Sequence, residues 1–280
     1  LMKKLGAAAQ EAGHSIEYIM CSSDPDSADG VIITDLGVCM IDGTAPHLCD
    51  VGLPGIDSEI VNLGIYWNKQ KLAPFAQEIE TMCAEKTKLY AKAYNCLSAM
   101  DRVEAITKSC SYPAFNHEKA DAYAARLVKQ FVPYNIGKET IRLIDSVGMK
   151  GFKTLPSFSA GTSYKIKPLY LTEYLLLDSI YAALKKKRLS MTVSYRYLDC
   201  AVINGIYLPE HDVSFTVGPV QSENDKMINS ERFVDKALLS KSKNKLRFAK
   251  KCKEELSQVL ADFFAQIGDT HFSIEKRYIS

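Results

Sequence analysis

The chain has 280 residues, of which 47% are hydrophobic and 24% are charged, a composition typical of a globular protein with one large or two smaller domains. Its 35 basic and 33 acidic residues leave a net charge of +2, which excludes a strong global attraction to nucleic acid or to a membrane surface. The eight cysteines form no C-x-x-C pair, and no run of about 18 apolar residues occurs, so we expect a reduced, cytoplasmic protein without a transmembrane helix.

Residues 1–47 predict a helix followed by two strands. Residues 1–12 carry apolar side chains near the helical period, and Gly13 stands where a helix C-cap is expected. Residues 15–21 and 38–41 are short apolar runs typical of buried strands in a parallel sheet. The second run ends in Asp42, and apolar residues followed by an acid form the pattern of a Walker B strand, whose Asp holds Mg²⁺.

Polar residues that follow these two strands are the candidate site. We expect Asp42 to bind the metal, and Asp24 or Asp26 to position an attacking water or a phosphate acceptor. The residues expected to line the nucleotide are Ser22, Ser23, Thr44 and His47. Two alternatives stay open, because Asp24 and Asp26 are also typical turn formers and a lone loop histidine such as His47 is often only a surface residue.

The runs CSSDPD (residues 21–26) and DGTAPH (residues 42–47) resemble the segment after Walker A in a largely uncharacterised bacterial family of tandem P-loop ATPases. The resemblance is strong from Leu1 to about Ile65 and looser at residues 114–121 and 158–163. It implies ATP and Mg²⁺ as cofactors and a nucleotide as partner, and says little about the substrate. No Gly-x-x-x-x-Gly-Lys-Ser/Thr occurs in the chain, so we expect an N-terminal truncation just after Walker A, and a C-terminal one as well.

A long helical pattern covers residues 68–106, and a second follows at residues 117–131. Together they predict a helical insertion over residues 66–131, which could bind a protein partner or pack on a second domain. The loop-rich residues 48–64 could cover the nucleotide as a lid or serve as a structural connection.

The two halves of the chain can be aligned with each other without gaps, with Leu1 opposite Leu176. This alignment also places Asp24 opposite Asp199, and the helix and strand patterns of the two halves coincide. It predicts two tandem repeats at residues 1–140 and 141–280. Residues 167–175 occupy the second Walker A position without any glycine, and Val217 stands where the first repeat has Asp42. We therefore expect the second repeat to have lost its nucleotide chemistry.

The basic residues 236–253 could bind nucleic acid phosphates. The favoured alternative is the solvated face of an amphipathic helix that ends at Gly268, which leaves nucleic acid outside the expected partners.

The sequence thus predicts an α/β protein with two P-loop NTPase-like parallel sheets flanked by helices. Mg²⁺-dependent ATP hydrolysis is the expected activity of the intact protein. An ATP-dependent small-molecule kinase is one alternative. A catalytically inactive scaffold that binds a partner is the other, and it describes the 280-residue chain without a phosphate loop best.

Overall fold

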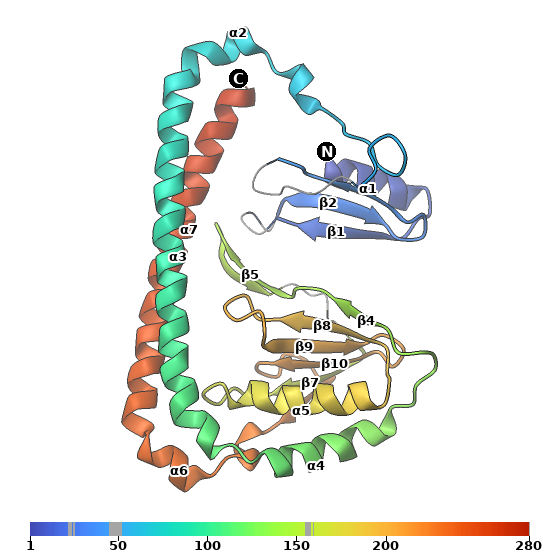
Figure 1. The fold of residues 1–280 in the computed structure, drawn as a ribbon, viewed down its shortest axis with the longest axis vertical. Helices are drawn as coiled ribbons and strands as arrows, with labels where there is room; N and C mark the ends of the chain where they lie inside the picture. Colours follow the sequence, from blue (N-terminus) through green and yellow to red (C-terminus); the bar gives the residue numbers. More distant parts are fainter. Residues whose placement is uncertain (22–23, 25, 45–51, 155–157, 159, 280) are drawn as a thin grey trace. The chain divides into compact units, whose positions relative to one another are not determined.

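The computed structural model describes residues 1–21, 24, 26–44, 52–154, 158 and 160–279. The helices are α1 (Met2–Glu11), α2 (Lys69–Leu72), α3 (Ala76–Ser111), α4 (His117–Leu127), α5 (Thr172–Lys186), α6 (Lys236–Lys241) and α7 (Lys243–Ile279) (Figure 1). The strands are β1 (Ile16–Met20), β2 (Ala28–Ile33), β3 (Val38–Ile41), β4 (Glu139–Ile141), β5 (Asp145–Gly148), β6 (Gly151–Thr154), β7 (Thr162–Ile166), β8 (Met191–Tyr195), β9 (Ile203–Leu208), β10 (Val213–Val217) and β11 (Asp225–Ile228).

Two compact units make up the chain, and each is built from separate stretches of sequence. Unit 1 comprises Leu1–Lys92, Val147–Gly151 and Ala261–Ser280, and unit 2 comprises Ala93–Ser146 and Phe152–Leu260. The division expected between residues 140 and 141 does not coincide with these units. The reason is that Ala93–Ser146 packs within unit 2, whereas the end of α7 belongs to unit 1.

Unit 1 contains α1 and a three-stranded sheet in the order β1-β2-β3. The helix is confirmed, and Gly13 follows its C-cap residue with a φ of +90°. The predicted parallel sheet of buried strands is wrong here, because both strand pairs are antiparallel and three of the four residues of β3 are exposed. A short turn at Gly37, with φ +64°, joins β2 to β3, and a connection of this length permits only antiparallel pairing.

Unit 2 is a mixed α/β structure around a six-stranded sheet with the order β11-β7-β10-β9-β8-β4. The pairs β11·β7, β7·β10 and β8·β4 are parallel, whereas β10·β9 and β9·β8 are antiparallel. Helices α4 and α5 lie along the sheet (Figure 1), and their apolar faces share one core with it. Fully buried members of that core include Ala120, Ala124, Leu176, Leu177, Ile180, Leu184, Ile206, Leu208 and Phe215.

The offset predicted from the sequence relates two sets of elements in the structure. We call α1, β1, β2 and β3 (residues 2–41) the first motif, and α5, β8, β9 and β10 (residues 172–217) the second motif. Ile16 begins β1 where Met191 begins β8, and Ala28 begins β2 where Ile203 begins β9. Both pairs of strands therefore start at the same offset as Leu1 and Leu176.

The two motifs also share their irregularities. The register shift at Ile19/Met20 in the first motif recurs at Ser194/Tyr195 in the second. Positive φ angles occur after the helix at Gly13 and Arg188, and in the turn before the third strand at Gly37 and Asp212. The correspondence therefore extends to individual bulges and turns, which a chance similarity of helix and strand order does not explain.

One difference separates the motifs, and it lies at the third strand. In the second motif β10 is paired with β9 on one side and with β7 on the other, and four of its five residues are buried. In the first motif β3 pairs with β2 alone within the described ranges, which leave out residues 45–51. Among the described residues, the third strand of the first motif thus has no partner on its outer edge.

We expect Gly205→Ala to destabilise unit 2 by about 1–3 kcal/mol, because a core overpacked by a methyl group must shift its neighbours. A Cβ atom at Gly205 would lie 2.9 Å from Ile144 Cδ1 and 3.0 Å from Phe158 Cε2. The control is Gly43→Ala, since a Cβ atom there meets nothing within 4 Å. Urea unfolding measures both, and equal stabilities of the two variants would contradict the packing at Gly205.

The long helical patterns of the sequence are confirmed. Residues 69–111 form α2, a short 3₁₀ turn and α3, and residues 117–130 form α4 and its 3₁₀ extension. The expected helix end at Gly268 is wrong, because α7 continues to Ile279. Gly268 packs against Met149, whose Sδ would be 2.9 Å from an added Cβ atom, so close packing explains this glycine. None of the helices within the described residues is long and apolar enough to cross a membrane.

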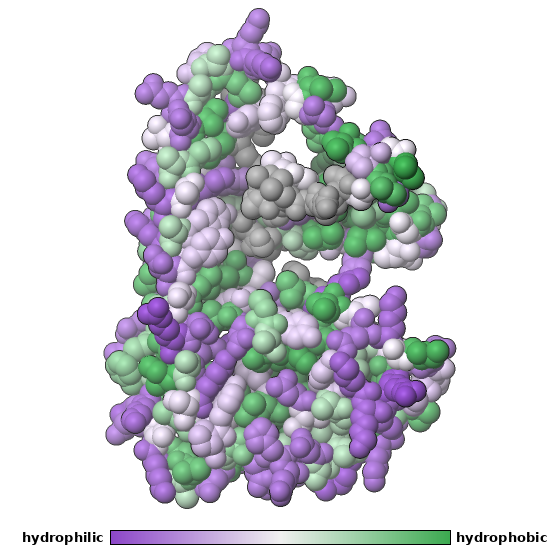
Figure 2. Space-filling model, in the orientation of Figure 1, coloured by the Kyte–Doolittle hydropathy of each residue, from purple (hydrophilic) through white to green (hydrophobic). Residues whose placement is uncertain are grey.

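Unit 1 exposes many apolar side chains in the segment of residues 52–67, where Figure 2 shows apolar surface. Ile56 is 82% exposed and Ile65 is 70% exposed. The segment contains a 3₁₀ turn at Leu63–Tyr66, and Trp67 contacts Tyr278 of α7 within the same unit. Whether this segment covers a ligand stays a prediction.

Candidate functional site

Asp24 closes a turn in the loop between β1 and β2. Its Oδ1 accepts a hydrogen bond from the Asp26 amide at 3.1 Å, and its Oδ2 accepts one from Ser27 Oγ at 2.6 Å. Asp199 does the same in the second motif, where its Oδ1 accepts from the Ala201 amide at 3.2 Å. The turn-forming role that the sequence left as the alternative for Asp24 is therefore present in both motifs.

Lys150 brings Asp24 and Asp26 together. Its amino group forms ion pairs with both carboxylates, at 3.7 Å from Asp24 Oδ1 and at closer range to Asp26. The hydrogen bond from Ser27, followed by the Asp26 amide and the charge of Lys150, lowers the pKa of Asp24 although partial burial opposes this. Sequence reasoning missed Lys150, because a single lysine far along the chain from Asp26 gives no pattern in the sequence.

Asp42 follows β3 directly and is partly buried. Its amide donates to the Asp29 carbonyl at 2.7 Å, and its Oδ1 accepts from the amide of the exposed Thr44 at 2.8 Å. This short turn holds the carboxylate at the end of the strand. Three other predicted site residues, Ser22, Ser23 and His47, lie outside the described residues.

A Mg²⁺ ion bound to a nucleotide usually takes only one or two carboxylate ligands from the protein, and its other ligands include the substrate phosphates. A single carboxylate such as Asp42 fits this requirement. The described residues contain no group of three or more His, Cys, Asp or Glu side chains that could hold a metal alone. A phosphate cradle is likewise not formed by the described residues near α1. The first motif thus offers a partly buried carboxylate at the end of a strand and a helix N-terminus, and whether Asp42 binds a metal stays a prediction.

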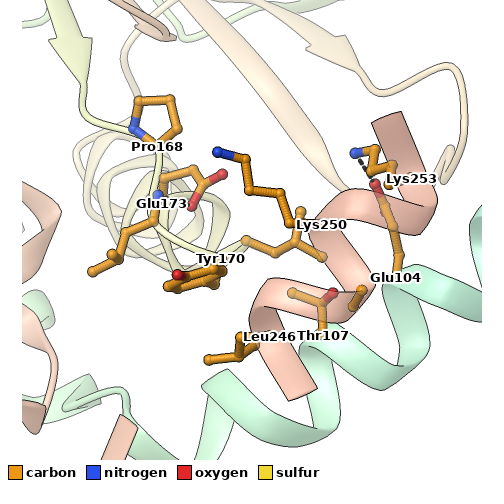
Figure 3. A pocket seen from close by; sticks show the side chains of 11 residues that line it. Glu104, Thr107, Pro168, Tyr170, Glu173, Leu246, Lys250 and Lys253 are labelled. Carbon is orange, nitrogen blue, oxygen red and sulfur yellow. Dashed lines mark hydrogen bonds and ion pairs between the residues drawn. The ribbon is translucent and has the colours of Figure 1, made fainter. Parts of the chain in front are cut away.

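A strand and a loop precede the second motif and complete a strand-loop-helix arrangement, and a cavity of about 410 Å³ lies beside the loop (Figure 3). Strand β7 leads through residues 167–171 into α5. The cavity is lined by this loop and by residues of α3, α5 and α7, namely Glu104, Thr107, Pro168, Leu169, Tyr170, Leu171, Glu173, Leu246, Ala249, Lys250 and Lys253. Tyr170 and Leu171 have φ angles of 51° and 71°, a conformation unusual for residues with side chains.

Glu173 is a buried carboxylate that binds a backbone amide of this loop. Its side chain is only 4% exposed, and its Oε2 accepts a hydrogen bond from the Leu169 amide at 2.7 Å. Burial raises the pKa of the Glu173 carboxyl, which the Leu169 amide and the charge of Arg196 offset only in part. Residues 167–171 contain no glycine, and the Leu169 amide already donates to the Glu173 carboxylate. This loop therefore does not fit the phosphates of a nucleoside triphosphate, which need free backbone amides at close range.

A cluster of three charged side chains lies beside the cavity, and two of its members, Glu104 and Lys253, line it. Arg196 donates to both carboxylate oxygens of Glu104, at 2.8 Å and 2.6 Å, and Lys253 pairs with the same carboxylate. Burial alone would raise the pKa of Glu104, but the hydrogen bonds and charges of Arg196 and Lys253 hold it below its ordinary value. Glu104 therefore stays ionised and the cluster is held together by charge-assisted bonds.

A scan against protein-family models and searches of curated proteins and of solved structures found no match to the chain. The two motifs, Asp42 and the cavity are therefore the features of the molecule that bear on its function.

Proposed function

We propose that the first motif belongs to a Mg²⁺-dependent ATP-binding site of P-loop type, and that the second motif is a diverged duplicate kept as a scaffold. The observation that carries this proposal is the residue-by-residue correspondence of the two motifs, bulges and turns included. Strand β7, which precedes the helix of the second motif, runs parallel to β10, the third strand of that motif. Nucleotide-binding α/β proteins bind phosphates at such a strand-loop-helix junction.

The position of Asp42 supports the metal assignment. Its counterpart Val217 pairs with Ile166, the last residue of β7 before the loop into α5. A strand paired with β3 in the same way would end beside Asp42, and the loop after it would lie at the N-terminus of α1. A carboxylate at this point can hold Mg²⁺ that is bound to nucleotide phosphates. The resemblance of residues 42–47 to the segment after Walker A gives the same assignment.

ATP hydrolysis is the reaction we propose for this site when it is complete. Asp24 and Asp26 are held by their turn and by Lys150, so their proposed role is limited to shaping the loop next to the site. A small-molecule kinase would instead release inorganic phosphate only slowly without its acceptor, and this separates the two reactions experimentally.

The test is a calorimetric titration of Mg²⁺-ATP into the 280-residue chain and into a version with a designed strand and a Gly-x-x-x-x-Gly-Lys-Ser loop joined before Leu1. We expect binding to the extended version only. Asp42→Ala should weaken it at least about tenfold in Mg²⁺ and abolish its dependence on the metal.

The control for this titration is Asp101→Ala, which removes an exposed carboxylate from α3 in unit 2 and should leave binding unchanged. An extended version that is folded but takes up no Mg²⁺-ATP would overturn the ATP proposal. Both motifs would then be scaffolds, and the long helices α3 and α7 would be the place to look for a protein partner.

A further inference from the structure

The basic stretch of residues 236–253 carries positive charge that its surroundings do not compensate. It forms α6 and the first part of α7, and all of it lies in unit 2 (Figure 1). The stretch contains eight Lys and Arg residues and no Asp or Glu. Four of the eight are paired with acids, namely Lys236 with Glu231, Lys250 with Glu254, Lys251 with Glu255 and Lys253 with Glu104. The other four are exposed and form no ion pair with a described residue, and we call them the basic cluster: Lys241, Lys243, Lys245 and Arg247.

The basic cluster lies where cations do not stabilise the helix. Lys243 and Lys245 stand in the first turn of α7, which contains no acidic residue. Cations at this end are unfavourable, because the N-terminus of a helix carries a partial positive charge. Neither ion pairing nor helix stability therefore explains the cluster, and its charge favours an anionic partner.

An exposed aromatic ring lies among these cations. Phe248 is 66% exposed, whereas Leu246 and Ala249 beside it are each 1% exposed. Residues three apart are neighbours on a helix surface, so Lys245 and Lys251 flank Phe248 on the solvent side of α7. A solvated face of an amphipathic helix, which the sequence favoured for this stretch, accounts for the lysines but not for a phenylalanine at the centre of that face.

A single exposed ring between cations suits a nucleic acid strand whose bases are unpaired. Such strands bind through phosphates that contact Lys or Arg and through bases that stack on aromatic side chains. A duplex fits less well, since its bases present only their edges in the grooves. A bilayer fits less well too, because a helix that lies on it buries a whole apolar face. The apolar side of α7 at Leu246 and Ala249 is already covered by protein, which leaves Phe248 alone.

We propose that α6 and the first turns of α7 bind single-stranded nucleic acid, with a base stacked on Phe248 and phosphates in contact with the basic cluster. Each phosphate neutralised on a single strand contributes about −0.7 to the slope of log affinity against log salt concentration. The four side chains of the cluster therefore predict a slope of about −3. This surface shares no residue with the proposed ATP site at Asp42, and the two proposals are independent.

The experiment measures binding of a labelled oligothymidylate to the full chain by fluorescence anisotropy, over a range of salt concentrations. We expect Phe248→Ala to weaken binding at least about fivefold without changing the salt dependence, because stacking is lost and the phosphate contacts are kept. Lys245→Gln combined with Arg247→Gln should make the slope less steep by about 1.4, since two phosphate contacts are lost. An abasic strand of the same length should bind at least about fivefold more weakly than oligothymidylate.

The matched controls are Tyr134→Ala and Lys186→Gln, which remove an exposed ring and an exposed cation elsewhere in unit 2. Tyr134 is 67% exposed, nearly the same as Phe248, so neither aromatic truncation removes a core side chain. Each control should change the affinity less than about twofold, because surface charges and rings away from the strand contribute little.

Three results would overturn the proposal. One is a wild-type chain that does not bind oligothymidylate at low salt. Another is an abasic strand that binds as tightly, or a Phe248→Ala variant as mild as Tyr134→Ala, which would mean general attraction of polyanions. The last is displacement of the strand by an equal charge of polyglutamate or of phosphatidylserine vesicles, which would assign the surface to an acidic protein or to a membrane. Asp42→Ala is expected to leave this binding unchanged, so failure of the ATP proposal and failure of this one can be told apart.

Discussion

Replacing Arg196 by alanine is expected to lower the free energy of unfolding of unit 2 by about 3 kcal/mol or more, because it leaves the buried Glu104 with a single, partly exposed cation, Lys253. Arg196 is 5% exposed and Glu104 is 1% exposed. The guanidinium also lies over the Tyr174 ring, with Cζ 4.5 Å from its centroid, so packing is lost together with the charge. Urea unfolding followed by circular dichroism measures the change.

The control for Arg196→Ala is Lys251→Ala, which breaks the exposed pair with Glu255 on α7. Exposed pairs of this kind contribute little, and we expect a change below about 0.5 kcal/mol. If Arg196→Ala were as mild as Lys251→Ala, the buried cluster would not be the structural tie between α3, β8 and α7 that its geometry indicates.

Phe215→Ala should cost about 3–5 kcal/mol, since it removes a fully buried aromatic side chain from the six-stranded sheet. The Phe215 ring stacks on Tyr164 with centroids 5.0 Å apart and meets Phe131 edge to face at 6.1 Å. Its counterpart in the first motif is Met40, which is only partly buried in β3. We expect Met40→Ala to cost less than about 1 kcal/mol, as a large part of that side chain already faces solvent.

The comparison of Phe215→Ala with Met40→Ala tests the difference between the two motifs at matched positions. Denaturant unfolding of the two variants gives both values. Similar costs would mean that the sheet face carrying Met40 is covered in solution as the face carrying Phe215 is, and would contradict the partial exposure of Met40.

Local patterns in the sequence were enough to predict much of the fold. The helical period predicted α1, α3 and α4, and the offset between the two halves predicted the correspondence of α1 with α5 and of β1 with β8. The sheet of unit 1 could not be predicted in the same way. Strand β2 was not predicted, and without it β1 and β3 were expected to be parallel strands of one sheet.

Contacts between distant parts of the chain are the part that the sequence did not predict. The tie between Lys150 and Asp26 and the cluster of Glu104, Arg196 and Lys253 join residues that share no motif or spacing. The cavity depends on such contacts too, because α3 and α7 supply Glu104 and Lys250 to a loop that is far away in sequence. The sequence already shows that this loop lacks glycine. The structure adds that the Glu173 carboxylate accepts a hydrogen bond from the Leu169 amide.

Asp24 shows how the repeat separates structural from chemical roles. The sequence offered it as a catalytic residue or as a turn former. Asp199 repeats its turn in a motif that has Val217 in place of Asp42, so the turn is kept where the expected metal ligand is not. Asp42 has no such duplicate, and it is the residue on which the proposed chemistry depends.

The most direct test of the two-motif account is amide hydrogen exchange of the full chain, resolved by residue with NMR. The account predicts strong protection throughout β10, because it lies between β7 and β9. It predicts fast exchange of alternate amides in β3, which pairs only with β2 in the part of the chain that the structure describes. Uniform protection of Val38–Ile41, equal to that of Val213–Val217, would contradict it. That result would mean that the amides on both edges of β3 are hydrogen-bonded, as they are in β10.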